Sequence, residues 1–284
     1  MTLTVTAVGP QALVEDVLGR RGFGSSGVST SGAYDRASLL RAHRILGNEP
    51  SLAGIEVLMG GLSLRADDDH LVCVTGAAGA LHVDGKPIHH EWPTLVSAGQ
   101  TLRLGLAEIG MRTYVSVQGG IQAPAVLGSP ATDTLSGLGA SPLSVGDVLA
   151  VGNEFDGAVA GQPEVRLGNG DVTIEVIVGP RDDWFTAEAL AMFWTTRWSV
   201  SSESDRVGMR LEGPALARSR SGELPSEPCM RGSIQVTAQG QPIIFGPDHP
   251  VTGGYPVIAV VTDNHADLLG QVRPGQGLRF ARRG

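Results

Sequence analysis

Short apolar runs, several of them alternating with polar residues, recur along this chain of 284 residues, and helical spacing is found in two segments. Alternation with a period of two is typical of half-buried strands, and the Gly, Pro, Asp and Asn residues between the runs indicate turns. We therefore predict short strands over residues 3–7, 12–17, 55–58, 62–65, 71–75, 80–83, 94–96, 101–104, 112–117, 172–178, 233–237, 242–245, 257–262 and 277–281.

The first helical segment has an apolar stripe over residues 39–46 and a closing Gly47-Asn48. Residues 29–31, Ser-Thr-Ser, are candidate N-caps, and Asp35 is expected in the first turn. The serine-rich loop before this helix fits either an anion site or plain helix capping, and both readings stay open. A second helix is predicted from about Asp182 to Thr195.

Residues 22–27 read Gly-Phe-Gly-Ser-Ser-Gly, a literal G-x-G-x-x-G. In a dinucleotide-binding fold, a helix follows the third glycine directly. Here the loop-like residues 28–32 follow instead, so we do not predict that fold.

A weak internal repeat occurs in both halves of the chain. Residues 97–102, 144–149 and 273–278 share a turn glycine followed by an apolar strand, and each half of the chain has one helix among strands. We therefore predict two related β-barrel-like domains, residues 1–151 and 169–284, with a linker at about 152–168 where periodicity is lacking.

Composition supports a β-rich protein and narrows its partners. The 40 glycines imply many tight turns, and the net charge of −8 disfavours binding to nucleic acid or to an anionic membrane. Lys86 is the single lysine, which argues against a lysine phosphate loop or a lysine Schiff base. No apolar run approaches membrane-spanning length, and residues 1–21 do not resemble a signal peptide, so we expect a cytoplasmic protein.

The sequence contains no complete catalytic motif. His89-His90-Glu91 is its local group of metal-binding residue types, but neighbours in a strand face opposite sides, so we expect a surface hairpin and no metal site there. Residues 204–214 concentrate two arginines and two acids, and residues 248–256 combine an acid, a hydroxyl, a glycine pair and a phenol.

At these motifs the chain resembles the family of the 5-oxoprolinase C subunit, also called allophanate hydrolase subunit 2, with its carboxyltransferase A/B domain. The matching segments are 27–29, 31–33, Asp35, 47–48, Glu56, 74–77, 119–121, 127–129, 132–133, 146–147, 204–206, 210–213, 234–236, 240–244 and 252–256. Tyr34, Val207, Gln118 and Pro250-Val251 depart from the family pattern, which suggests a different substrate preference at the loop edges.

The resemblance implies a mainly β fold of two cyclophilin-like β-barrels with a few short helices. It implies a partner protein of the B type and a hydrolase of the A type, assembled in a hetero-oligomer, and use of ATP and Mg²⁺, although the chain has no self-contained motif for either. It also implies one of three roles. These are ATP-dependent opening of 5-oxoproline to glutamate, carboxyl transfer to urea in a urea-degrading system, or non-catalytic capture of a kinase inhibitor that is itself a B-type protein.

We rank the 5-oxoprolinase role first, because the chain carries neither a biotin-carboxylase nor a biotinyl segment. The expected catalytic residues are Asp35, Arg206, Asp248 and Tyr255, and the expected substrate-binding residues are Ser31, Asn48, Glu56, Gln235, Gln241, Thr252 and Gly253. We predict that these residues, apart from Ser31 and Gly253, converge around one pocket or groove, with Arg206 holding a phosphate or carboxylate and Asp35 or Asp248 acting as a base or holding Mg²⁺. The alternative is that Arg206 pairs with Asp205 or Glu212 and only stabilises the second domain.

Overall fold

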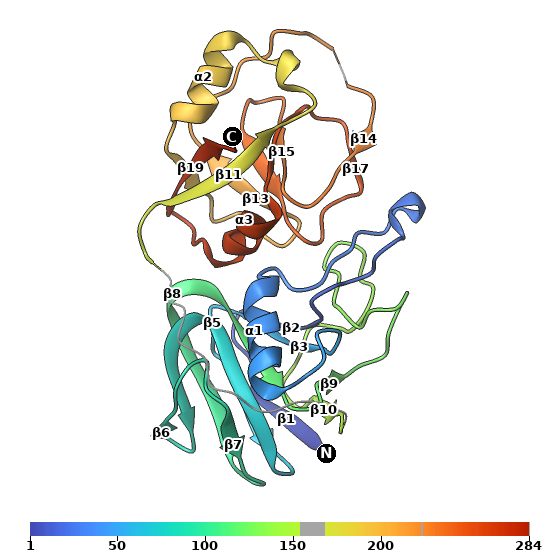
Figure 1. Cartoon of the computed structure of the whole chain (residues 1–284), viewed down its shortest axis with the longest axis vertical. Helices are drawn as coiled ribbons and strands as arrows, with labels where there is room; N and C mark the ends of the chain where they lie inside the picture. Colours follow the sequence, from blue (N-terminus) through green and yellow to red (C-terminus); the bar gives the residue numbers. More distant parts are fainter. Residues whose placement is uncertain (154–167, 223, 284) are drawn as a thin grey trace. The chain divides into compact units, whose positions relative to one another are not determined.

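The computed structural model describes residues 1–153, 168–222 and 224–283 (Figure 1). The chain divides into two units, one formed by residues 1–20 and 31–168 and the other by residues 21–30 and 169–284. Grouping of residues 21–30 with the second unit was not expected from the sequence. The domain boundaries at 151 and 169 stay a prediction, and most of the expected linker, 152–168, lies outside the described residues.

The first unit is a ten-stranded sheet curled into a barrel. Its main path runs β2-β3-β8-β4-β1-β10-β9, and β5 pairs with β6, β7 and β8. A bridge between Ile121 of β9 and Ala53, the residue before β3, brings the β9 end of the path back to β3, the neighbour of β2. The strands are β1 Thr2–Ala7, β2 Gln11–Glu15, β3 Gly54–Leu58, β4 Ser63–Ala66, β5 His70–Val83, β6 Lys86–Pro87, β7 Thr94–Val96, β8 Thr101–Val117, β9 Ile121–Gln122 and β10 Val148–Val151.

Two strands of this unit are longer than the sequence predicted. The runs 71–75 and 80–83 join into β5, and 101–104 and 112–117 join into β8. The glycines between the runs form bulges, because the pairing of β5 with β8 shifts register between Gly76 and Leu81. A Cβ on Gly79 would lie 2.4 Å from the Leu106 carbonyl oxygen, so this close approach requires glycine.

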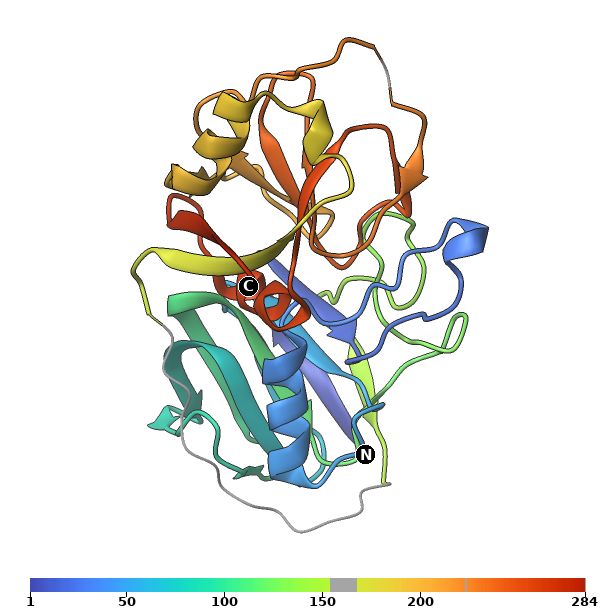
Figure 2. The same ribbon diagram turned by 45° about the horizontal axis from the view of Figure 1, so that its top comes forward.

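Helix α1, Arg36–Leu46, packs on β5 and β8 and follows a short 3₁₀ turn, η1, Gly24–Ser26 (Figure 2). Its N-cap is Asp35, whose carboxylate accepts the Ser38 amide, so the predicted caps at 29–31 are wrong. The backbone explains the difference, since Ser31 and Gly32 have φ of 54° and 84°, in the left-handed region. Gly47 ends the helix in the left-handed conformation, as predicted.

The second unit is a closed barrel in the order β11-β18-β15-β16-β13-β12-β19, and parallel pairing of β19 with β11 closes it. Alternation builds its core, since Ile174 and Val176 of β11 are buried whereas Thr173, Glu175 and Ile177 between and beside them are exposed. The strands are β11 Val172–Val178, β12 Trp198–Val200, β13 Gly208–Glu212, β14 Glu227–Pro228, β15 Ser233–Val236, β16 Pro242–Phe245, β17 Thr252–Gly253, β18 Val257–Val261 and β19 Gly277–Arg282.

The predicted second helix is two elements, the 3₁₀ turn η2, Asp182–Trp184, and α2, Ala187–Thr195, which Thr186 caps. Phe185 between them is extended and buried, which breaks the helix. A further short helix, α3, Asp263–Leu268, continues into the 3₁₀ turn η3, Leu269–Gln271, and was not predicted.

The internal repeat is confirmed in atomic detail. In each copy the turn glycine has positive φ, at Gly99, Gly146 and Gly275. In each copy the side chain after that glycine (Gln100, Asp147 or Gln276) accepts the backbone N–H three residues earlier. The predicted fold class, mainly β with two barrels and few short helices, is confirmed. Among the described residues, no helix has the length and apolar character needed to span a bilayer.

Candidate functional site

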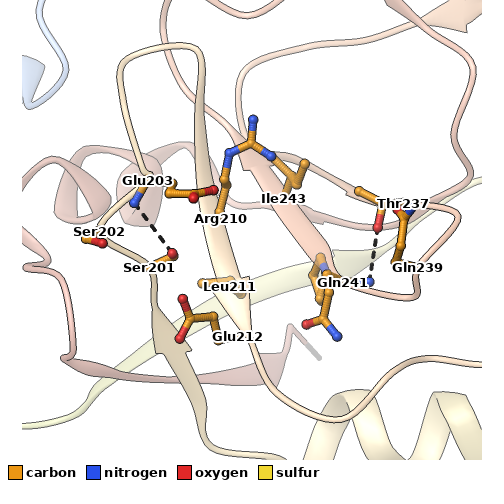
Figure 3. A pocket seen from close by; sticks show the side chains of 11 residues that line it. Ser201, Ser202, Glu203, Arg210, Leu211, Glu212, Thr237, Gln239, Gln241 and Ile243 are labelled. Atoms are coloured by element: carbon orange, nitrogen blue, oxygen red, sulfur yellow. Dashed lines mark hydrogen bonds between the residues drawn. The ribbon is translucent and has the colours of Figure 1, made fainter.

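A pocket of about 410 Å³ opens on the outer side of the second barrel (Figure 3). It is lined by residues 201–203 after β12, by residues 210–212 of β13, and by the turn and strand segment 237–243. Arg210 and Glu212 are exposed and the intervening Leu211 is buried, so β13 turns both charged side chains outward. Gln241 is the expected site residue that lines this pocket.

The expected catalytic residue Arg206 does not line that pocket and forms a buried ion pair. Its Nε and Nη2 donate to the two carboxylate oxygens of Asp248 at 2.8 and 3.1 Å, and the side chains are 2% and 0% exposed. The alternative prediction, that Arg206 pairs with Asp205 or Glu212, is therefore wrong about the partner. The backbone N–H of Asp248 also donates to the Arg206 carbonyl, so the pair anchors the loop that begins at Gly246.

This loop carries Thr252, Gly253 and Tyr255. Gln235 of β15 donates through Nε2 to the Tyr255 carbonyl at 3.0 Å, so a loop satisfies this buried amide, as the sequence allowed. A Cβ on Gly253 would lie 2.3 Å from that Nε2, so glycine makes room for the amide. Thr252 is exposed, and the Tyr255 side chain is 43% exposed with the Arg218 guanidinium 5.7 Å from its ring centre.

The expected residues of the first unit lie in a buried hydrogen-bond network. Glu56 accepts from the Tyr114 hydroxyl and the Tyr34 amide at 2.8 Å each, and from Nε of Arg112 at 3.2 Å. The Tyr114 hydroxyl accepts the Asp35 amide at 2.7 Å. Burial, followed by the nearby charges of Glu56 and Asp35, raises the pKa of Tyr114 well above its usual value, so its hydroxyl stays protonated.

Asn48 and Ser31 also hold backbone segments in place. Asn48 donates through Nδ2 to the Val117 carbonyl at 2.7 Å and accepts the Gly119 amide at 2.9 Å. Ser31 donates through its hydroxyl to the Thr132 carbonyl. The neighbouring His43 is fully buried, and burial lowers its pKa to about 4 against a smaller opposing effect of the Leu52 backbone.

The described residues form no protein cage for a metal ion. They include no group of three or more His, Cys, Asp or Glu side chains placed to hold a metal ion. The pocket offers two carboxylates, Glu203 and Glu212, and an arginine beside them. Mg²⁺ held together with ATP usually takes only one or two carboxylates besides the phosphates, so this finding locates no ATP site, and we derive no step through ATP at this chain's own residues. The prediction that residues 89–91 lie at the surface is wrong for Glu91, because this side chain is buried and pairs with Arg41 at 2.8 Å.

Comparison with known proteins identifies the family. The family described as "Carboxyltransferase domain, subdomain A and B" matches residues 26–282. The chain belongs to this carboxyltransferase family. It is 34% identical over 281 residues to the C subunit of the 5-oxoprolinase of Escherichia coli, covering 98% of this chain and 90% of that protein.

Other members of the carboxyltransferase family are much longer. The urea amidolyase of Saccharomyces cerevisiae is 32% identical over 98% of this chain, which spans 16% of that protein. The crystal structure of the K. lactis urea amidolyase superposes on all of this chain with a TM-score of 0.95 and 28% identity, and the chain spans 19% of it. The chain therefore matches nearly the whole length of a 5-oxoprolinase C subunit, but only a small part of a urea amidolyase.

Sequence reasoning missed most of the polar side chains of the pocket in this family member. Arg210, Glu212, Glu203 and Thr237 line it, whereas the sequence interpretation chose Arg206 from the same motif. The alternation of residues 208–212 was the available signal, because it places Arg210 and Glu212 on the outer face of a strand. Convergence of the remaining expected residues on one pocket stays a prediction.

Proposed function

We propose that this chain is the C subunit of an ATP-dependent 5-oxoprolinase that opens 5-oxoproline to glutamate together with B-type and A-type partners. The observation that carries the proposal is the 34% identity, at 90% coverage of that protein, with a 5-oxoprolinase C subunit. ATP is assigned to the assembled system, and no residue of this chain is proposed to bind it.

The candidate residues divide by exposure into two proposed roles. Thr252 and Tyr255 are exposed and are proposed to contact the substrate. Arg206 and Asp248 are proposed to position the loop that carries them, since each satisfies the other's charge in a buried pair. Asp35 is the proposed proton acceptor, because its two oxygens accept from the uncharged amide and hydroxyl of Ser38. Both oxygens of Asp248 instead pair with the cationic guanidinium of Arg206.

The test is reconstitution with the B-type and A-type partners from a 5-oxoprolinase system. We expect glutamate to form from 5-oxoproline, ATP and Mg²⁺ only when this chain is present with both partners. No glutamate from the complete mixture would refute the proposal. Stable binding to the B-type partner without turnover would instead support a binding protein.

Carboxyl transfer to urea is the second candidate, favoured by the TM-score of 0.95 with the urea amidolyase structure. Its test replaces 5-oxoproline by urea and supplies a carboxylated biotin donor with the B-type partner. Urea carboxylation without 5-oxoproline opening would favour this role over the first.

A further inference from the structure

The pocket on the outer side of the second barrel contains charged groups that the proposed 5-oxoprolinase role does not use. Arg210, Glu203 and Glu212 are exposed in it, and none of them forms an ion pair with any residue that the structure describes. Figure 3 shows the Arg210 and Glu212 side chains on the same strand. Side chains two residues apart on one face of a strand lie about 7 Å apart, close enough for one small molecule to contact both.

Gln241 contributes a buried hydrogen-bond acceptor to the same pocket. Gln241 lines the pocket, and its Oε1 is buried without a hydrogen-bond donor in the described part of the chain. Its Nε2 donates to the Gly213 carbonyl at 3.2 Å, which fixes the orientation of the amide, since a flipped amide would place two oxygens together. A buried acceptor without a donor is unfavourable, so a bound donor would stabilise this arrangement.

The balance of these groups defines the chemistry of a ligand. The two carboxylates and the Gln241 oxygen accept hydrogen bonds, so they would bind a donor, above all an ammonium group. The Arg210 guanidinium would bind a carboxylate. The charged side chains sum to −1, which disfavours an anion. Pro242 and Ile243 add an apolar wall, and 410 Å³ lies within the usual range for small-molecule sites.

We propose that this pocket binds a free α-amino acid without net negative charge, with its carboxylate on Arg210 and its ammonium group on Glu203, Glu212 and the Gln241 oxygen. The pocket is separate from the proposed roles of Thr252 and Tyr255. Neither Thr252 nor Tyr255 lines the pocket. It lies wholly within the second unit, so the purified chain suffices to test it.

The experiment is calorimetric titration of the full-length chain with L-glutamine, without its A-type and B-type partners. We expect saturable binding with a Kd of about 1 mM or tighter. L-Glutamate, which carries a net negative charge, and N-acetyl-L-glutamine, which lacks the ammonium group, should each bind at least about tenfold more weakly. Absence of saturable L-glutamine binding, or equal binding of N-acetyl-L-glutamine, would overturn the proposal.

Matched variants assign the binding to this pocket. Arg210→Gln and Glu212→Gln should each weaken L-glutamine binding at least about tenfold, and Gln241→Met should weaken it as well. Arg279→Gln and Glu175→Gln change exposed charges elsewhere on the same barrel and should leave the Kd unchanged. Wild-type affinity in both pocket charge variants would contradict the assignment. Because no partner protein is present, this result is independent of the 5-oxoprolinase assay.

Discussion

At the scale of single residues, the arginines of one short motif have opposite environments. Arg206 is buried against Asp248, whereas Arg210, four residues later, is exposed in a polar pocket. The composition of the motif led to the choice of Arg206, although the alternation of residues 208–212 already placed Arg210 on an outer strand face. The burial of Arg206 depends on Asp248, a partner 42 residues away, which the composition of the motif does not reveal.

The buried pair should contribute strongly to stability when one partner is removed. Arg206→Ala leaves the Asp248 carboxylate buried without its guanidinium, and we expect the free energy of unfolding to fall by about 3–5 kcal/mol. Equilibrium unfolding in urea measures this decrease in the free energy of unfolding. The matched control is Arg197→Ala, which breaks an exposed pair with Asp171 and should lower the free energy of unfolding far less than Arg206→Ala. Equal effects of the two substitutions would contradict a structural role for the buried pair.

The buried His43 should make stability depend on pH. Its pKa falls from 6.5 to about 4 on folding because of burial, so the folded protein holds the neutral form. This contribution is complete above pH 6.5 and is lost as pH falls towards 4, by up to about 3 kcal/mol. We expect His43→Gln to flatten the decrease in unfolding free energy between those pH values, measured by urea unfolding at a series of pH values. His89→Gln changes an exposed histidine and should keep the wild-type slope, and an unchanged slope in His43→Gln would refute the assignment.

At the scale of secondary-structure elements, local signals located most strands, and non-local pairing decided their lengths. The turn glycines 99, 146 and 275 were recognised because a positive-φ turn needs little beyond its own residues. Gly76 and Gly79 looked alike in the sequence but form bulges inside β5, because β8 continues to pair across them. Helix α3 was missed because its six residues are too few to show a helical period.

Helix α1 offers a way to separate capping from catalysis at Asp35. Asp35→Ala removes the acceptor for the Ser38 amide and should lower the free energy of unfolding by about 1 kcal/mol, whereas Asp35→Asn keeps a cap and should unfold nearly as wild type. If Asp35 is also the proton acceptor, Asp35→Asn should still lower 5-oxoproline turnover by about 10²-fold or more. Urea unfolding and the reconstituted assay measure the two effects. Full turnover in Asp35→Asn would leave Asp35 with the capping role only.

At the scale of the whole molecule, the sequence predicted two barrels because a repeated turn and strand pattern occurs in both halves of the chain. It did not predict that residues 21–30 group with the second unit, because that grouping arises from contacts distant in sequence. The prediction of a single pocket also depends on residues that are distant in sequence, because the expected residues are distributed over both units. Sequence motifs nominate such residues separately, and only a measurement of coupling tests whether they act together.

A double-mutant cycle provides that measurement. Asp35→Asn changes the proposed proton acceptor of the first unit, and Tyr255→Phe removes an exposed hydroxyl from a loop of the second. Effects of distant, independent residues on the activation free energy add within about 0.5 kcal/mol, whereas residues that act on one substrate couple more strongly. We expect the double variant to lose less kcat/KM in the reconstituted enzyme than the product of the single losses, by at least about threefold. Leu268→Ser, another exposed position in the second unit, serves as the control and should combine additively with Asp35→Asn. Additivity of Asp35→Asn with Tyr255→Phe as well would contradict the prediction that the two residues act as one unit on the substrate.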